Sequence, residues 1–261
     1  MTQQYHITWF RAGQQQPLRN VRLHAPSVIQ ILSGSKQLYW QATAMALSSS
    51  QLLLCEASTS LTFENQPHKG RFLSRMFSFH VPPSDALLAL SHTQAEQGDL
   101  PVPWLPVDSA LEVTLNALAM FEGESMTAAT QTHWVMGFYQ QLAERGKLHA
   151  LFPEADLPFS QQIGRYLSHS PDEEHPLEQV AAQFAMSRAT LIRKLKAEGR
   201  QYREVLAEVR LNHALYLMQQ GQTNVAMLAQ SCGYQSEGRF SQRFKHQFGL
   251  TPSGYIKTLS N

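Results

Sequence analysis

The sequence predicts an α+β fold, in which an N-terminal β-sandwich and a helical segment precede an all-α domain. Three observations carry this prediction. Short apolar runs fill the chain up to about residue 80, helical periodicity sets in at residue 111, and the C-terminal part repeats one basic helical pattern. The predicted boundaries are 1–105 for the sandwich, 106–158 for a helical linker or dimerisation segment, and 159–261 for the all-α domain.

The first predicted layer consists of β-strands. Apolar runs of strand length are separated by polar breaks, at a spacing typical of a sandwich or barrel; they read ITWF, SVIQIL, KQLYW, QLLLC, LTF and RFLSRMFSFH. From Leu111 to about Leu151 the apolar residues recur at every third or fourth position instead, which predicts helices. We expect these helices either to form a dimer seam or to cover the sandwich.

The composition of the chain excludes several classes of protein. No stretch approaches the roughly 20 apolar residues of a transmembrane helix. The N-terminus, MTQQYHITWFRAG, lacks the basic-then-apolar order of a secretion signal. Cys55 and Cys232 are too few for a disulfide framework or a zinc knuckle. We therefore expect a cytoplasmic protein that does not enter a membrane and that keeps both thiols reduced and buried.

The net charge of +1 conceals an asymmetry along the chain. Residues 1–159 carry 9 Lys and Arg against 12 Asp and Glu, whereas residues 185–261 carry 11 against 4. A neutral-to-acidic N-terminal part joined to a basic C-terminal part is typical of a regulatory module tethered to a nucleic-acid binder.

The basic half contains an internal repeat. VAAQFAMSRATLIRKLKAEG (180–199) aligns with LAQSCGYQSEGRFSQRFKHQFG (228–249). Each copy begins with an apolar-alanine segment, turns, and continues from a serine into a basic helix whose apolar residues step by four. Ser187 and Ser236 are placed to cap these helices. The repeat predicts two helix-turn-helix motifs, at about 177–198 and 225–248.

The turns and the connection between the motifs can also be predicted. Gly233 supplies the unusual backbone angle that the second turn needs, while Ala185 and Met186 must supply it in the first. A long apolar helix is expected from Tyr202 to Gln219, with a length of about 27 Å at ~1.5 Å per residue. Such a helix could hold two recognition helices roughly 34 Å apart, one turn of duplex DNA, within a single chain.

Residues from about Leu177 to Tyr255 resemble the DNA-binding domain of the AraC/XylS family of bacterial transcription regulators. The resemblance is carried by LEQVAAQFAMSRATLIRKLKAEG, REVLAEVRLNHALYLM and VAMLAQSCGYQSEGRFSQRFKHQFGLTPSGY. It implies a sequence-specific regulator, an activator, that binds double-stranded promoter DNA and works with RNA polymerase. It further implies that the front is a cupin-like β-sandwich, which senses a small-molecule effector or a regulatory protein, and that the chain forms a homodimer.

The polar faces of the two recognition helices provide two sets of expected DNA contacts. An arginine such as Arg193 can pair with the two acceptors of guanine. The contacts to base edges are expected from Ala189, Thr190, Ile192, Arg193, Glu237, Gly238, Ser241 and Gln242. The contacts to phosphates are expected from Arg188, Lys196, Arg239, Arg243 and Lys245.

A metal-dependent enzyme is the main alternative to a regulator. A catalytic cupin needs histidines and a carboxylate that converge on a metal ion, but the front contains no His-x-His pair. We therefore expect no catalytic residue, metal or cofactor. Two alternatives stay open: a cupin-type metalloenzyme with a DNA-binding tail, and an effector-free regulator controlled by a partner protein. If an effector with a carboxylate binds within the sandwich, Lys36, Arg71 and Arg75 are the candidate contacts.

Overall fold

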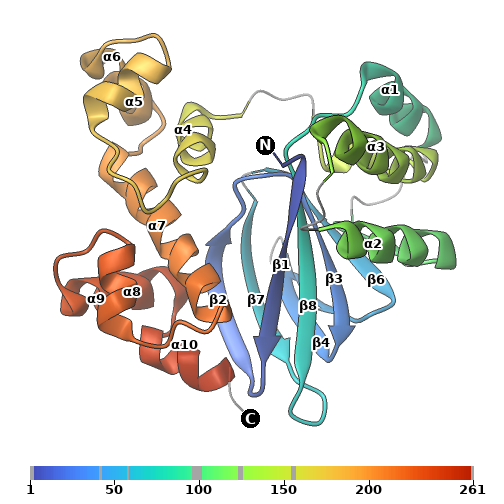
Figure 1. Ribbon diagram of the computed structural model, residues 1–261, viewed down its shortest axis with the longest axis horizontal. Helices are drawn as coiled ribbons and strands as arrows, with labels where there is room; N and C mark the ends of the chain where they lie inside the picture. The colour runs from blue at the N-terminus through green and yellow to red at the C-terminus, as the bar shows by residue number, and fades with distance from the viewer. Residues whose placement is uncertain are drawn as a thin grey trace.

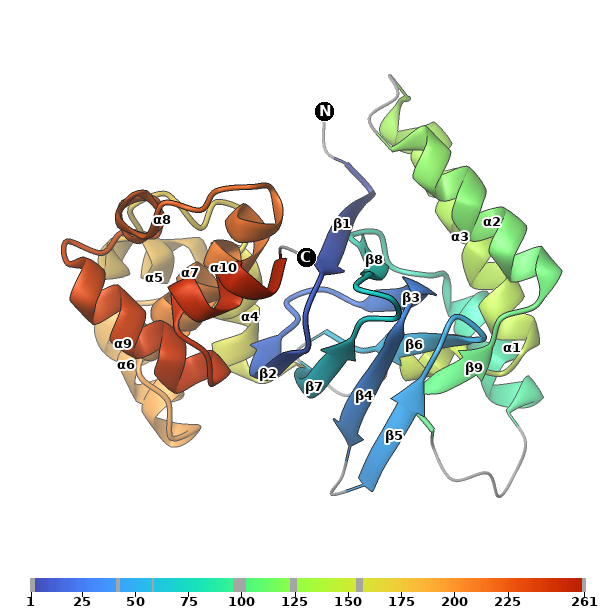
Figure 2. The same ribbon diagram turned by 90° about the horizontal axis from the view of Figure 1, so that it is seen from below.

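The computed structural model describes residues 3–40, 43–57, 59–95, 102–122, 126–153 and 157–259. Two halves lie side by side (Figures 1 and 2). A β-sandwich with helices on one of its faces forms one half, and a group of helices from the C-terminal part of the chain forms the other. The predicted α+β architecture and its order along the chain are confirmed.

The sandwich consists of two antiparallel sheets. The five-stranded sheet has the order β1-β8-β3-β6-β9, and the four-stranded sheet has the order β2-β7-β4-β5. Each of the six predicted apolar runs coincides with a strand, and RFLSRMFSFH exceeds its strand by one residue at each end. The strand bounds are β1 Tyr5–Ala12, β2 Gln16–Arg22, β3 Ser27–Ser33, β4 Ser35–Trp40, β5 Thr43–Leu47, β6 Gln51–Cys55, β7 Ser60–Gln66, β8 Phe72–Phe79 and β9 Trp104–Pro106.

A helical layer covers the outer face of the five-stranded sheet. It contains α1 (Asp85–Gln94), α2 (Ser109–Phe121), α3 (Ala128–Glu144) and the short 3₁₀ helix η1 (Leu148–Ala150). Leu115 of α2 and Phe138 of α3 are fully buried in one cluster with Phe77 of β8. The hydroxyl of Tyr5 donates to the carbonyl of Leu118, 2.8 Å away. Of the two roles expected for the helices that follow Leu111, covering the sandwich is therefore the one that this structure shows.

The C-terminal half is entirely helical within its described residues. Its helices are α4 Phe159–Leu167, α5 Leu177–Gln183, α6 Arg188–Ala197, α7 Tyr202–Gln219, α8 Val225–Ser231, α9 Glu237–Phe248 and α10 Pro252–Leu259. Helices α5 and α6 form the first predicted helix-turn-helix, and α8 and α9 form the second. The long connecting helix α7 has the bounds that the sequence predicts.

The two helix-turn-helix motifs are anchored differently. The first has a core of its own, in which Leu191 and Leu195 of α6 pack with α4, α5 and the first half of α7. The second shares one continuous core with the sandwich: Phe240, Phe244 and Phe248 of α9 belong to the same cluster as residues of both sheets. Burial of apolar surface stabilises by about 25 cal/mol per Å², so this shared core holds the second motif against the sandwich.

The two turns use the same backbone geometry although only one contains glycine. Ala185 has φ 52° and Gly233 has φ 71°. In each turn the following amide donates five residues back, from Met186 to Ala181 at 3.0 Å and from Tyr234 to Ala229 at 2.9 Å. The prediction that residues 185–186 replace the glycine turn is confirmed. Ala185 adopts the left-handed conformation, which is unfavourable for a residue with a Cβ atom.

Replacing Ala185 with glycine should therefore raise the free energy of unfolding, by about 0.5–1 kcal/mol, because the Cβ penalty is removed. Urea unfolding of the full chain measures this change. Gly233→Ala is the matched reverse substitution and should destabilise, since its added Cβ would also lie 2.5 Å from Nη1 of Arg210. A loss of stability in Ala185→Gly would contradict the interpretation of the turn.

Candidate nucleic-acid interface and interdomain cavity

Helix α6 presents its polar face to solvent. Ser187 caps it, because the Ser187 hydroxyl accepts from the backbone amide of Thr190 at 3.2 Å. Leu191 and Leu195 point inward and are at most 1% exposed. Among the residues predicted to contact DNA, Thr190 is half-buried and the others are exposed; these are Arg188, Ala189, Ile192, Arg193 and Lys196.

Helix α9 repeats this arrangement. The Ser236 hydroxyl accepts from the amide of Arg239 at 3.4 Å, and the helix ends at Gly249 with φ 89°. Phe240, Phe244 and Phe248, the apolar residues that step by four along this helix, are buried. Of the predicted DNA contacts, Ser241 is half-buried and the others are exposed; these are Glu237, Gly238, Arg239, Gln242, Arg243 and Lys245.

The faces of the two helices have the exposure that DNA contact requires. Both views place α6 and α9 in the half of the molecule that lies away from the α1–α3 layer (Figures 1 and 2). One predicted phosphate contact already has a partner in the protein, because Arg188 Nη1 lies 2.9 Å from Glu178 Oε1. Both side chains are 62% exposed, so this ion pair is weak and can be exchanged for a phosphate at little cost.

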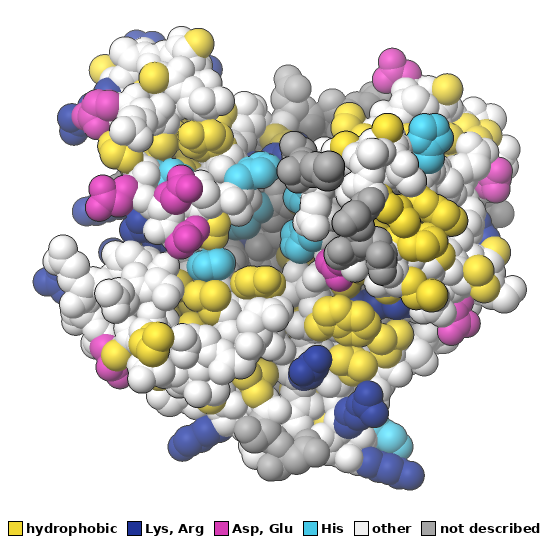
Figure 3. Space-filling model, viewed as in Figure 1, with side chains coloured by type: hydrophobic (Ala, Val, Ile, Leu, Met, Phe, Trp, Pro, Cys, Tyr) yellow, Lys and Arg dark blue, Asp and Glu magenta, His cyan; other side chains and the backbone are white. Residues whose placement is uncertain are grey.

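A cavity of about 570 Å³ lies between the sandwich and the helical half. Five histidines line it: His6 of β1, His24 after β2, His80 after β8, His169 after α4 and His213 of α7. Histidine side chains are visible in this hollow in the space-filling view (Figure 3).

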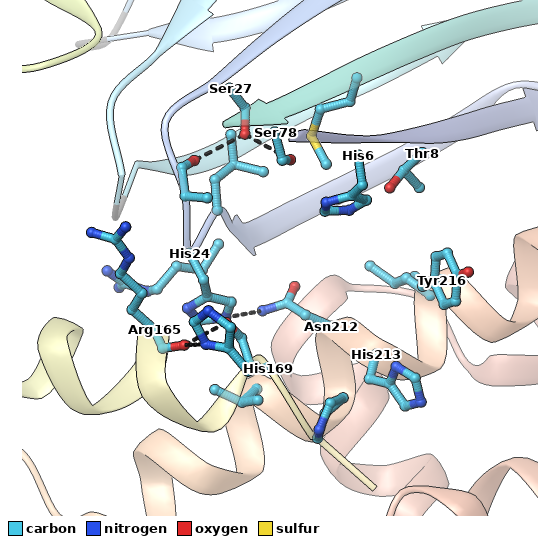
Figure 4. Close-up of a pocket in the computed structure, with 18 of the residues that line it drawn as sticks. His6, Thr8, His24, Ser27, Ser78, Arg165, His169, Asn212, His213 and Tyr216 are labelled. Carbon is cyan, nitrogen blue, oxygen red and sulfur yellow. Dashed lines mark hydrogen bonds between the residues drawn. The ribbon is translucent and has the colours of Figure 1, made fainter. Parts of the chain in front are cut away.

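The polar groups of the cavity connect the two halves of the molecule (Figure 4). The Asn212 side chain, on α7, donates to Nε2 of His24 at 3.4 Å. His6 Nδ1 and His80 Nε2 are 3.3 Å apart, so one ring donates to the other. His169 donates through Nδ1 to the carbonyl of Arg165 at 2.8 Å.

Burial favours the neutral form of four of these imidazoles, those of His6, His24, His80 and His213. It lowers the pKa of His24 to about 4, with Glu208 raising it and Arg22 lowering it to smaller extents. It also lowers the pKa of His80 to about 4, and His6, His169 and Arg165 lower it further. The pKa values of His6 and His213 are lowered by burial as well. Near pH 7 the cavity therefore offers neutral hydrogen-bonding rings beside arginine cations.

Comparison with known proteins identifies the helical half. Residues 180–258 match a family described as a helix-turn-helix domain. An uncharacterized HTH-type transcriptional regulator of Haemophilus influenzae is 36% identical over 122 residues, which is 46% of this chain and 40% of that protein. The transcriptional regulator SirC of Salmonella typhimurium is 32% identical over 83 residues, 32% of this chain and 28% of SirC.

Residues 180–258 are an AraC-type helix-turn-helix domain. The predicted family is thus confirmed for this part of the chain. The two matched stretches span only 40% and 28% of the relatives' own lengths. Both relatives are described as transcriptional regulators.

A solved structure shares the fold of the whole chain. ToxT from Vibrio cholerae superposes with a TM-score of 0.63 at 16% identity and covers 99% of this chain and 100% of its own. Another ToxT structure, bound to an unsaturated fatty acid, has a TM-score of 0.58 at 15% identity and covers 99% of this chain and 98% of its own. At these identities the likeness shows the fold, a sandwich followed by the AraC-type domain.

The three cations expected to bind an effector carboxylate lie in separate places. Arg75 donates to Gln30 at 2.8 Å and to Asn116 at 2.6 Å. Arg71 is exposed at a hairpin, where its backbone pairs with that of His68. Lys36 is 3% exposed within the sandwich. They do not converge on one cavity, and none of them lines the cavity between the two halves.

Lys36 instead begins a buried polar chain that reaches the AraC-type domain. Its Nζ donates to Asn65 at 2.5 Å, Asn65 donates to Gln16 at 2.9 Å, and Gln16 donates to the hydroxyl of Thr258 in α10 at 2.6 Å. Burial lowers the pKa of Lys36 to about 7, while Cys55 raises it to a smaller extent. The same burial raises the pKa of the Cys55 thiol to about 12, as expected of the core thiol predicted there.

Sequence reasoning missed the histidine cavity. None of the five histidines was singled out as a site residue from the sequence. The five rings come from positions 6, 24, 80, 169 and 213, so no local pattern marks them. Among the described residues, no group of three His, Cys, Asp or Glu side chains is arranged to hold a metal ion. No described helix is long and apolar enough to cross a membrane.

The depressed pKa of Lys36 predicts a pH dependence of stability. Its pKa is 10.5 ordinarily and about 7 in the folded chain, so the unfolded chain binds more protons between these values. Burial of the charged lysine destabilises the folded chain. This destabilisation is complete below pH 7 and is relieved as the pH rises toward 10.5. Between pH 7 and 9, this titration should raise the unfolding free energy of the natural chain by about 1 kcal/mol per pH unit. Lys36→Met should remove this rise.

Urea unfolding at several pH values measures this difference. The exposed Lys257 provides the control, because Lys257→Met should retain the pH dependence of the natural chain. Parallel stability curves for the natural chain and Lys36→Met would contradict a depressed pKa at this lysine.

Proposed function

We propose that the chain is a sequence-specific DNA-binding transcription regulator, an activator, whose two recognition helices read neighbouring segments of one promoter face. The observation that carries this proposal is the pair of serine-capped helices, α6 and α9, with their polar faces exposed and α7 between them. Helix α7 spans about 27 Å, and one turn of duplex measures roughly 34 Å. Such a regulator acts in the cytoplasm.

Base reading and phosphate contact are divided between particular side chains. Arg193 and Thr190 of α6 are the main base readers, together with Gln242 and Ser241 of α9. Lys196, Arg239 and Lys245 bind phosphates. Because Gly238 in the first turn of α9 offers no side chain, the second helix contributes less base recognition and depends more on DNA shape.

A matched pair of substitutions in α6 tests this division. Arg193→Ala should weaken binding to a selected duplex by about 1–3 kcal/mol and weaken random-duplex binding much less. Lys196→Ala should weaken both equally and lower the slope of log K against log salt by about 0.9. Fluorescence anisotropy across a salt series measures both quantities. Equal losses on both duplexes for Arg193→Ala would refute base reading.

The signal is received in the cavity between the two halves. We propose that the effector is a carboxylic acid with an apolar body. Ile7, Leu23 and Met76 supply apolar wall, while Arg165 and the neutral histidines supply donors for a carboxylate. The ligands named for ToxT, an unsaturated fatty acid and a naphthalenyl butenoic acid, share this chemistry. The cavity volume of about 570 Å³ is typical of small-molecule sites.

Calorimetric titration with palmitoleic acid tests the effector. Arg165→Gln should weaken binding by about 1.5–3 kcal/mol, the usual contribution of a hydrogen bond to a charged group. Arg71→Gln, at the exposed hairpin, should leave the affinity unchanged. Binding of the methyl ester as tight as that of the acid would contradict a carboxylate site, and absence of binding would favour control by a partner protein.

The proposal includes two macromolecular partners. Val113 and Met120 of α2 are 68% and 76% exposed, on the side of the helix that faces away from the sheet. These apolar side chains support a homodimer formed through the α2–α3 layer. As an activator, the protein would also contact RNA polymerase.

A further inference from the structure

Helix α7 and the second helix-turn-helix enclose a groove of about 940 Å³. Four arginines line it: Arg203 and Arg210 from α7, and Arg239 and Arg243 from α9. The remaining lining residues are uncharged and no acidic side chain is among them. We call this feature the arginine groove.

The positions of these arginines direct them into the groove from both sides. Residues 203 and 210 are seven apart on α7, which is two helical turns, and residues 239 and 243 are four apart on α9. Each pair therefore lies on one helix face. The ion pairs found within the described ranges are formed by Arg22, Arg145, Arg188 and Arg200, and none involves the four arginines of the groove.

The local structure fixes one of these arginines in place. Arg210 Nη2 donates to the carbonyl of Glu173 at 3.1 Å. A Cβ atom at Gly233 would lie 2.5 Å from Arg210 Nη1, so the glycine of the turn also gives the guanidinium its space. Arg203 and Arg239, in contrast, are exposed. The groove thus combines a fixed cation with exposed cations that can adjust to an anion.

Like charges that converge without a carboxylate partner repel each other, and an anion in the groove would relieve that repulsion. An ordinary solvated basic surface would have its arginines spread out or paired with acids. Arginine guanidinium groups match phosphate oxygens in two-point hydrogen bonds. The groove is therefore suited to an anion that presents several phosphate groups.

We propose that the arginine groove receives phosphates of the DNA backbone between the two major-groove segments that α6 and α9 occupy. This inference rests on the proposed function. Helix α7 connects the two motifs, so when both recognition helices enter the duplex, α7 faces the backbone that separates them. The connecting helix is then itself a DNA-binding element, through Arg203 and Arg210, in addition to the phosphate contacts expected from α9.

Arg203→Gln tests this proposal, because the side chain is exposed and its replacement should leave the fold intact. The slope of log K against log salt should fall by about 0.9. The affinity should fall by the same factor for a duplex selected by the full chain and for random duplex. Arg71→Gln removes the same charge from the sandwich hairpin and should change neither quantity. An unchanged slope in Arg203→Gln, with specific binding intact, would overturn the inference and leave the proposed function standing.

Neutral methylphosphonates placed in the selected duplex locate the contact. Substitution between the two major-groove segments should weaken binding by the natural chain and have a much smaller effect on Arg203→Gln. Equal effects on both proteins would overturn the contact.

If the groove held a free polyphosphate instead, calorimetry with sodium triphosphate would show a site that Arg203→Gln removes while the DNA salt slope stays unchanged. A natural chain that binds no selected duplex more tightly than random DNA would refute the proposed function itself.

Discussion

The arrangement of this protein depends on one shared hydrophobic core. Phe244 and Phe248 of α9 lie in the same buried cluster as Leu18 of β2 and Leu38 of β4. A sandwich and a helix-turn-helix that share a core cannot separate without exposing apolar surface to water. The second recognition helix is therefore held by the sandwich, while the first has its own core and is connected to this unit through α4 and α7.

Polar contacts also connect the sandwich with the helical half, close to the histidine cavity. Glu208 of α7 bridges the halves, because its carboxylate lies 2.5 Å from Arg22 Nε and 2.9 Å from Arg200 Nη2. The histidine cavity opens beside this bridge, and the chain that starts at Lys36 ends at Thr258 in α10. A ligand in the cavity would contact α4 and α7 directly. These two helices pack in the core of the first motif, and α7 connects the first motif to the second.

Local sequence signals were sufficient for the DNA-binding half, and they failed where contacts are long-range. The serine caps, the four-residue apolar steps and the length of α7 are all encoded within a few turns of helix. Strand β2 was missed because its alternation is weak, with Arg19 and Asn20 exposed beside half-buried Val21. Those polar residues bind the end of α9: Arg19 donates to the carbonyl of His246, and Asn20 donates to that of Gln247. The histidine cavity was missed for the same reason, since only tertiary packing brings its residues together.

Hydrogen exchange of the full chain, followed by mass spectrometry, tests the shared core most directly. Leu18→Ala removes a side chain of β2 that is 5% exposed, and Leu115→Ala provides a matched change in the separate core beneath α2. If the core is shared, Leu18→Ala lowers protection in β2, α9 and α10 together, whereas Leu115→Ala lowers it first in α2 and α3. Unchanged protection of α9 and α10 in Leu18→Ala would show that the sandwich does not hold the second recognition helix.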